Sequence, residues 1–313
     1  MPVDIARLQT MATIRDPVGG ISERFVEVSL RSGSTLGVLS IPTGAQATTG
    51  WVISHSFGPE HLNLSALDVA LARRLASQGA PTLRFHCQGY GDSERTNFAP
   101  SIASHVEDTI DATQALRALT GVTSVGLLGT NFGASCALLA GQQVSADRLV
   151  LIAPAVQGFR FLRGLVRAGA IIDLTESSDP DDTPEAWSSL KAGGSISVRG
   201  TVITGDDYHD FAGMDLRMTQ GFTGKALVVQ VSAGTEPRRD LSELSDRLES
   251  EGARVTRATI TDRSAALLGE RHFRPVDSDL LGDIAFDLHR KIIDLVAEWS
   301  TDPGRLPEGR PGR

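Results

Sequence analysis

The sequence predicts an α/β protein with a mostly parallel, doubly wound sheet. Several short runs are apolar on both faces, as is typical of buried parallel strands, at 51–56, 81–86, 124–130, 148–154 and 226–232. Segments with apolar residues at three- and four-residue steps alternate with these runs, at 64–79, 102–121, 132–142 and 240–252. Strands that alternate with helices in this way form one sheet with helices on both faces.

The first part of the chain departs from this pattern. Residues 22–41 contain two stretches of alternating apolar and polar residues around a Gly/Ser turn. This alternation is typical of an antiparallel hairpin with one solvated face. We therefore expect an antiparallel N-terminal hairpin on an otherwise parallel sheet.

A long connection interrupts the alternation between the predicted strands at 148–154 and 226–232. It begins with an amphipathic helical pattern at 159–172 and continues with an acidic, turn-rich stretch at 175–185. It is either a substrate-gating lid or a helix packed on the sheet with a solvated acidic loop. The predicted organisation is a core of 1–154 and 225–300, a lid or cap at 155–224, and a disordered Pro/Gly/Arg-rich tail at 301–313.

The composition predicts which kinds of partner and which cellular location to expect. The 313 residues include 30 Lys and Arg against 38 Asp and Glu, which gives a net charge of −8. An acidic chain offers no broad positive field for phosphates, so nucleic acid is not an expected partner. No stretch approaches the roughly 18 apolar residues of a membrane span. Cys87 and Cys136 are too few for a disulfide framework, so we expect a cytoplasmic protein.

The most informative motif follows the predicted strand at 124–130. Gly129, Gly133 and Ala134 surround Asn131 at the turn into the next helix, and small neighbours there permit a strained backbone. The pattern is that of a nucleophile elbow, Gly-x-Ser-x-Gly, with asparagine in place of serine. An amide is a poor nucleophile, so a serine acyl-enzyme is not expected.

Segments around this turn resemble the α/β-hydrolase superfamily. They are HSFGPEHLN, LRFHCQGYGDSE and VSAGTEP, each at the end of a predicted strand. More narrowly, FGPEHLNLS, LRFHCQGYGDS, LVLIAPAVQGFRFLR and ISVRGTVITGDDYHDFAGMDL resemble the exosortase A system-associated hydrolase group, whose members also tend to lack the elbow serine. The resemblance covers nearly the whole chain and implies an α/β-hydrolase fold.

The resemblance also implies roles for matching positions. Asn131 takes the nucleophile position, Glu236 falls where the triad acid follows its strand, and His272 falls in the late loop that supplies the histidine. The backbone N–H of Phe132 and one from Ser56–Phe57 would form an oxyanion hole. His86 stands where relatives usually place an aspartate, and we expect it with His55 at the rim of the substrate site.

Each of these roles has a plainer alternative. Asn131 either donates a hydrogen bond to a substrate carbonyl or simply tolerates an unusual backbone conformation. His272 and Glu236 are either an acid/base pair or a loop histidine and a solvated acid before the helix at 239–252.

Other nucleophiles and a metal were also considered on chemical grounds. Cys87 beside His86 is the best substitute nucleophile, ahead of Ser56, Ser135 and Cys136, although free cysteines are usually inert. His55, His86 and His272 have no recognised metal-binding spacing, and no phosphate-binding glycine motif follows a strand. We expect neither a metal nor a cofactor.

Two classes of function follow. The first is an enzyme that uses His/Glu acid-base chemistry and an oxyanion hole on a small molecule with a carbonyl or acyl group. The reaction would be isomerisation, epimerisation, elimination, cyclisation or direct attack by water. The second is a pseudo-hydrolase that binds an acyl or hydrophobic ligand without turnover, and a hydrolase with a displaced nucleophile is a further alternative. The sequence does not set the oligomeric state.

Overall fold

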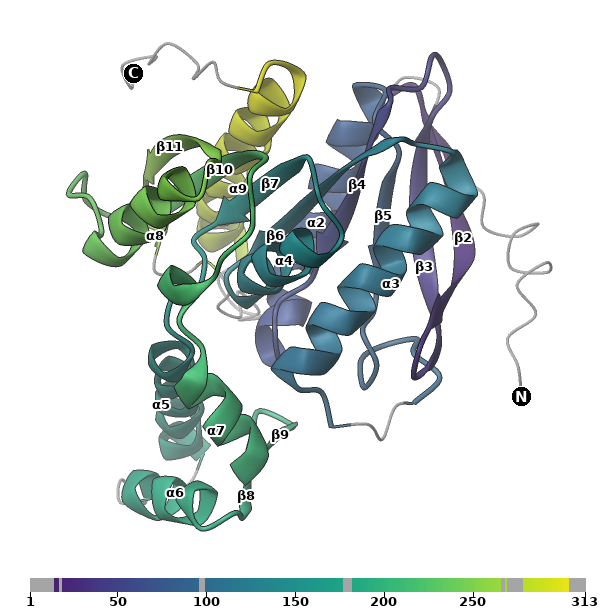
Figure 1. The fold of residues 1–313 in the computed structure, drawn as a ribbon. Helices are drawn as coiled ribbons and strands as arrows, with labels where there is room; N and C mark the ends of the chain where they lie inside the picture. Colours follow the sequence, from purple (N-terminus) through teal and green to yellow (C-terminus); the bar gives the residue numbers. More distant parts are fainter. Residues whose placement is uncertain are drawn as a thin grey trace.

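The computed structural model describes residues 14–16, 19–95, 99–176, 182–265, 268 and 278–303. Its main element is a nine-stranded sheet in the order β1-β2-β3-β5-β4-β6-β7-β10-β11 (Figure 1). The strands are β1 (Ile14–Asp16), β2 (Ile21–Leu30), β3 (Gly33–Pro42), β4 (Thr49–Ser54), β5 (Thr82–Phe85), β6 (Ser124–Thr130), β7 (Arg148–Ile152), β10 (Lys225–Ser232) and β11 (Arg254–Thr261).

The strand directions match the expected division of the sheet. β1, β2 and β3 pair antiparallel, and β3 also pairs antiparallel with β5. From β5 to β11 every pairing is parallel. The predicted hairpin is β2 and β3, with Leu30 opposite Gly33 at the turn. Both the mostly parallel sheet and the antiparallel N-terminal hairpin are confirmed.

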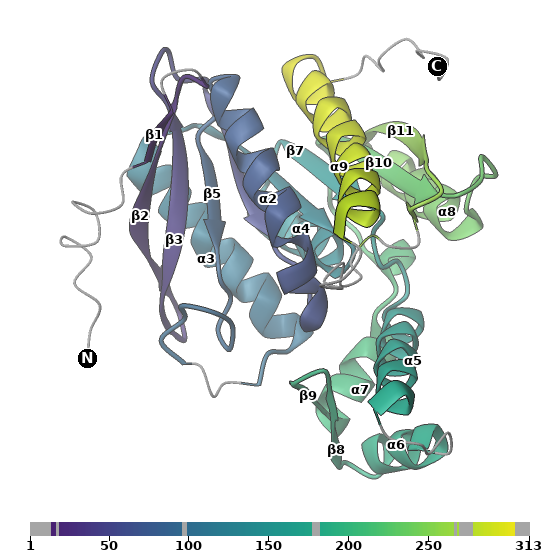
Figure 2. The same cartoon turned by 180° about the vertical axis from the view of Figure 1, so that it is seen from behind.

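Helices cover both faces of the sheet. α3 (Ile102–Thr120), α4 (Phe132–Gln143) and α8 (Arg239–Ser250) lie on the face that Figure 1 shows. α2 (Pro59–Ser77) and α9 (Ser278–Thr301) lie on the opposite face (Figure 2). The buried apolar residues form two clusters, one on each side, so the sheet is apolar on both faces. Among the described helices, none is long and apolar enough to cross a bilayer.

A segment inserted between β7 and β10, at 155–224, projects beyond the edge where the parallel strands end (Figure 1). It contains α5 (Gly158–Glu176), α6 (Asp182–Lys191), the hairpin β8 (Ser195–Val198) and β9 (Thr201–Thr204), α7 (Gly205–Gly213) and the short η1 (Leu216–Met218). The amphipathic pattern at 159–172 lies within α5. The acidic stretch expected to be turn-rich contains the start of α6.

β11 and α9 are among the described elements that lie outside the predicted set. β11 has charged and polar residues on its exposed positions, because it is the edge strand and pairs only with β10. α9 buries Leu288, Ile292 and Val296, which are spaced one helical turn apart. It ends at Thr301, and the tail from 304 lies outside the described residues.

Candidate functional site

Asn131 occupies a sharp turn between β6 and α4. Its φ of 51° and ψ of −120° lie in a region that residues other than glycine rarely adopt. The Asn131 N–H donates to the Ile152 carbonyl at 2.9 Å, and the Asn131 carbonyl accepts from Ala134 and Ala155. The backbone therefore holds both peptide groups of the turn, while the Asn131 side chain stays partly exposed.

Two glycines make this turn possible. A Cβ on Gly129 would lie 2.2 Å from the Gly133 carbonyl carbon, and a Cβ on Gly133 would lie 2.2 Å from the Ser54 carbonyl oxygen. Both clashes are with backbone, which cannot move aside as a flexible side chain can. The close approach of β6, α4 and β4 thus explains why glycines flank Asn131.

Two backbone donors next to the turn are available. Phe132 is the first residue of α4, and Phe57 lies in the loop after β4. In the described parts of the chain, no acceptor bonds the N–H of either residue. Their rings are in edge contact, with centroids 5.4 Å apart. The first N–H groups of a helix lack partners within the helix, so the pair can serve as an oxyanion hole.

A cluster of aromatic rings links this site to the inserted segment. Phe161 of α5 stacks on Phe132 with centroids 5.4 Å apart, and Phe211 of α7 contacts Phe57 at 5.3 Å. The hairpin also approaches the loop after β4, because a Cβ on Gly58 would lie 3.3 Å from the Thr201 hydroxyl. The inserted segment therefore packs directly on the two residues that carry the free N–H groups.

His55 has both ring nitrogens engaged. Its Nε2 accepts the Cys87 N–H at 3.0 Å, so Nδ1 carries the proton and donates to the Ser56 carbonyl at 2.8 Å. Burial and neighbouring histidines hold the pKa of His55 well below 6.5. The Ser56 hydroxyl donates to the Glu60 carboxylate at 2.6 Å. These bonds fix the loop that carries Phe57 and leave His55 neutral.

A small cavity of about 70 Å³ lies beside His55. Its polar lining comprises His55, His61, Ser65, Asp68, Arg84, His86 and Asp92. His86 Nδ1 accepts the Asp92 N–H at 3.2 Å. Burial lowers the pKa of His61 to about 4 and raises that of Asp68 to about 7. The cavity therefore contains neutral imidazoles beside a carboxyl group that titrates near neutral pH.

The remaining candidate nucleophiles are poorly placed for attack. Cys87 and Cys136 are fully buried, and burial raises the pKa of both thiols. The Ser135 hydroxyl is buried and donates to the Ala155 carbonyl at 2.9 Å. The burial of these three groups therefore does not support the alternative of a hydrolase with a displaced nucleophile.

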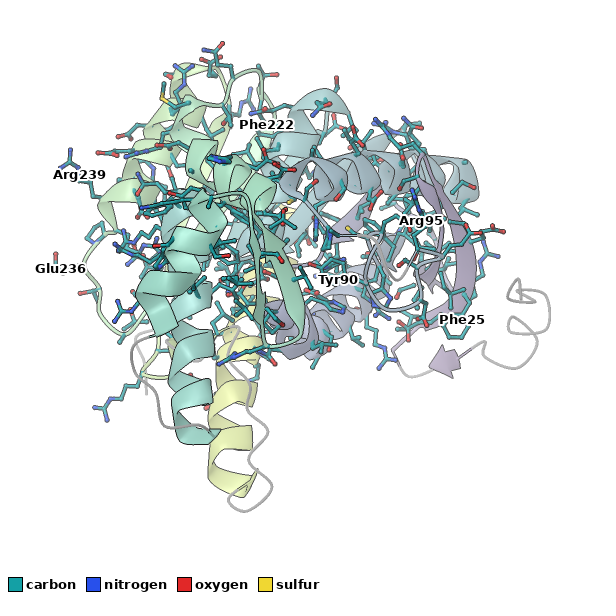
Figure 3. All side chains as sticks on the ribbon, turned by 90° about the horizontal axis from the view of Figure 1, so that it is seen from below. Phe25, Tyr90, Arg95, Phe222, Glu236 and Arg239 are labelled. Atoms are coloured by element: carbon teal, nitrogen blue, oxygen red, sulfur yellow. The ribbon has the colours of Figure 1, made fainter. Side chains whose placement is uncertain are left out.

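The predicted acid/base pair is only partly described. Glu236 lies in the loop after β10 with its side chain exposed, and Figure 3 places it at the outer edge of the molecule. Its carbonyl accepts from Gln230 at 2.8 Å, which ties the loop to β10. His272 lies outside the described residues, so its relation to Glu236 and Asn131 stays a prediction.

Three residues near the site were not among the predicted ones. His61 lies on α2, His105 on α3 and Tyr90 in the loop after β5. The Tyr90 hydroxyl accepts the Gly58 N–H at 2.9 Å, and Figure 3 shows this tyrosine near the centre of the view. His61 and His105 lie inside helical segments whose apolar residues recur every three or four positions. This spacing predicts the helices but does not indicate that either histidine lies near the site.

Comparisons with known proteins agree with this architecture. The family model described as serine aminopeptidase, S33 matches residues 52–171, which run from β4 through the Asn131 turn into α5. The esterase EstD of Thermotoga maritima is 26% identical over 136 residues, which are 42% of this chain and 33% of that protein. The matched region thus spans about a third of that relative's length.

Solved structures extend the similarity to most of the chain. Est1E from Butyrivibrio proteoclasticus, with ferulic acid bound, is 15% identical with a TM-score of 0.55, covering 87% of this chain and 99% of its own. An esterase of Pyrococcus furiosus gives 11% identity and a TM-score of 0.54, with 92% and 95% covered. The chain has the α/β-hydrolase fold.

A third solved structure is similar to this chain over most of its length. A protein from Xanthomonas campestris, described as an α/β serine hydrolase without lid, is 15% identical with a TM-score of 0.51, and 92% of this chain and 97% of that one are covered. Together the family model and the solved structures support the α/β-hydrolase superfamily for this chain. Asn131 lies at the sharp turn between β6 and α4, within the region that the family model matches.

Proposed function

We propose that this chain is an α/β-hydrolase-fold enzyme that acts on a small molecule with a carbonyl or acyl group without forming a serine acyl-enzyme. One observation carries the proposal: the strained turn at Asn131 lies beside the unpaired N–H groups of Phe57 and Phe132. This arrangement can stabilise negative charge on a substrate oxygen, and the side chain at the tip of the turn is an amide in place of a hydroxyl.

The acid-base part of the proposal rests on Glu236 and His272. In this scheme His272 moves the proton and Glu236 orients its imidazole. Asn131 donates from its amide to the substrate oxygen. Proton abstraction beside the carbonyl gives isomerisation, epimerisation, elimination or cyclisation, and activation of a water gives direct hydrolysis. The resemblance to the exosortase A system-associated hydrolase group, with its missing elbow serine, belongs to this proposal.

The inserted segment is the lid of this proposed site. Phe161 and Phe211 pack on the rings of Phe132 and Phe57, and Thr201 lies against Gly58. Movement of α5 and α7 would open the space above Asn131 and would expel water on closing. In this division 155–224 is the lid, and the regions before and after it form the core.

Turnover of a substrate panel tests the chemistry. Esters, thioesters and enolisable ketones are assayed with the wild type, Asn131→Ser, His272→Ala and Glu236→Gln, with Glu251→Gln as a surface control. Exchange of the α-hydrogen with deuterium, followed by NMR, detects proton abstraction without any net reaction. We expect His272→Ala to lower turnover about 10²- to 10⁴-fold. Full activity of His272→Ala on every substrate would overturn the acid-base role.

A serine-directed fluorophosphonate probe tests the missing nucleophile. The wild type should remain unlabelled, because the elbow side chain is an amide. Asn131→Ser should become labelled, since the turn and the two N–H groups are already present. Labelling of the wild type that survives Ser135→Ala and Ser56→Ala would contradict the assignment of Asn131 to the nucleophile position.

A non-catalytic binding protein is the second candidate. It is favoured by the cluster of rings formed by Phe57, Phe132, Phe161 and Phe211, which would become an apolar surface for an acyl or aromatic ligand once α5 and α7 move away. Calorimetric binding of acyl ligands without turnover or hydrogen exchange would favour it. Loss of that affinity in Phe161→Ala, with Phe159→Ala as the control, would locate the ligand over the elbow.

A further inference from the structure

Three potential metal ligands converge beside the loop after β4, which carries Phe57. His55 follows β4, Cys87 follows β5 and His105 lies in the first turns of α3. One ligand atom from each lies within 4.8 Å of the other two. His55 is 4% exposed, and Cys87 and His105 are not exposed at all. The three side chains come from separate parts of the fold and meet only in the folded chain.

Both imidazoles are oriented as they are in metal sites. His55 Nδ1 donates to the Ser56 carbonyl at 2.8 Å, and His105 Nδ1 donates to the Ser101 carbonyl at 3.1 Å. A carbonyl oxygen only accepts, so each Nε2 carries a lone pair. Ligating histidines usually donate their second nitrogen to a carbonyl or carboxylate in this way, which fixes the tautomer and the ring.

His105 Nε2 is the observation that points to a ligand. It is buried and has no hydrogen-bond partner among the described residues. A buried acceptor without a partner is unfavourable, and a cation would satisfy it. His55 Nε2 instead accepts the Cys87 N–H at 3.0 Å, and metal coordination would replace this bond.

The charges around the thiol suit a cation. The carboxyl group of Asp108 lies close enough to the Cys87 thiol to interact with it electrostatically. Asp108 accepts the Gln88 N–H at 2.8 Å. Binding of a cation forms a metal–sulfur bond and releases the thiol proton to solvent. With a divalent ion, one thiolate and the Asp108 carboxylate balance the charge, and with a monovalent ion the thiolate alone does so.

We propose that His55, Cys87 and His105 form a buried binding site for a thiophilic cation, either Zn²⁺ or Cu(I). A thiolate with two imidazoles suits these ions, whereas Mg²⁺ and Ca²⁺ prefer oxygen ligands. The cavity beside His61 borders His55, one of the three proposed ligands. This site differs from the histidine set considered from the sequence, because it contains neither His86 nor His272.

The position of the site suggests a structural role. The His105 ring contacts Phe132 and Phe57, with centroids 5.5 and 5.7 Å away. A cation held by His105 would therefore stiffen the packing beneath the two N–H donors without touching substrate. Structural Zn²⁺ sites have four ligands, so Zn²⁺ here would need one ligand besides these three side chains. The inference does not depend on the proposed enzymatic activity.

Metal binding to the untagged full chain tests the site. After treatment with chelator, the protein is titrated with Zn²⁺ in one arm and with Cu(I) under anaerobic reducing conditions in the other. Bound metal is measured by mass spectrometry, and Co²⁺ serves as a spectroscopic probe for a metal–thiolate bond. We expect one ion per chain, a thiolate-to-cobalt absorption band, and a higher Tm with the preferred ion.

Matched variants separate this site from adventitious binding. Cys87→Ser and His105→Gln should bind at least about tenfold more weakly. Cys136→Ser removes the other buried thiol, and His209→Gln removes an exposed histidine, and both should bind normally. Binding of neither Zn²⁺ nor Cu(I) by the wild type, absence of the cobalt–thiolate band where Zn²⁺ is the ion bound, or equal binding by all four variants would overturn the proposal. Because the cobalt band is read on the wild type, the test holds even where a variant fails to fold.

Discussion

The turn at Asn131 and the loop after β10 lie at the same edge of the sheet, yet they are built differently. The turn is fixed by backbone contacts between β6, α4 and β4, and its rare conformation does not depend on the side chain that it carries. The loop after β10 holds Glu236 exposed and is tied to the core through the Gln230 side chain. Backbone contacts therefore fix the conformation of the turn, whereas the position of Glu236 depends on an exposed side chain.

The largest effect should come from filling the space in the turn. Gly129→Ala places a methyl group against the Gly133 backbone, so we expect destabilisation of more than about 4 kcal/mol or no soluble protein. Gly234→Ala, in the loop after β10, has no atom within 4 Å of the new carbon and should change the free energy of unfolding by less than about 0.5 kcal/mol. Urea unfolding measures both, and similar values would remove the contrast.

Asp68, a buried acid that lines the cavity beside His55, should make the free energy of unfolding depend on pH. Burial raises the pKa of Asp68 from 3.8 to about 7, so its contribution to stability is complete below pH 3.8 and is lost as the pH rises through 7. Asp68→Asn should remove a slope of about 1.4 kcal/mol per pH unit within this window. The variant should therefore gain stability relative to wild type between pH 5 and 8, about 3 kcal/mol in all. Denaturant unfolding at several pH values would show otherwise if the two curves stay parallel.

The side chain at the tip of the turn should have a smaller effect. Asn131→Val introduces a β-branched residue at a positive φ, which we expect to cost about 1 to 2 kcal/mol. Asn131→Gly relieves the strain but loses more conformational entropy on folding, so its stability should stay within about 1 kcal/mol of wild type. Thermal unfolding of the two variants, compared with Asn131→Ser, measures the difference. Equal stability of Val and Gly would mean that the turn relaxes in solution.

The smallest effect should come from the loop acid. Glu236 is exposed, so Glu236→Gln should change the free energy of unfolding by less than about 0.5 kcal/mol. A larger loss in chemical denaturation would show that Glu236 has a structural partner, and its proposed role in orienting His272 would need a fresh explanation. Activity and stability can thus be read independently for this residue.

The sheet and the turn are the features that the sequence predicts best. The apolar runs of β4, β6 and β7 are buried on both faces and alternate with amphipathic helices, so their order follows from periodicity. Gly129 and Gly133 predict the turn because only glycine fits between those backbones. The apolar pattern does not predict β11, because this edge strand has polar residues where the inner strands are apolar.

The buried histidines show the limit of sequence patterns. His55 and His86 were predicted at the site because they directly follow strands. His61 and His105 lie inside helices, where nothing in the spacing indicates that they approach His55 within ring centroid distances of 4.7 and 5.2 Å. Their meeting depends on how α2 and α3 cross the two faces of the sheet, which is a tertiary property.

At the Asn131 turn, the flanking glycines fix the backbone and the residue at the tip provides the side chain. This separation has an evolutionary consequence. Because the turn keeps its shape through glycine contacts, asparagine and serine should be exchanged at its tip at less cost to folding than a β-branched residue would have. A single codon change between asparagine and serine would then move the protein between two kinds of chemistry on one unchanged scaffold. Under the proposed function, a lineage could abandon or regain covalent catalysis at this position in one step.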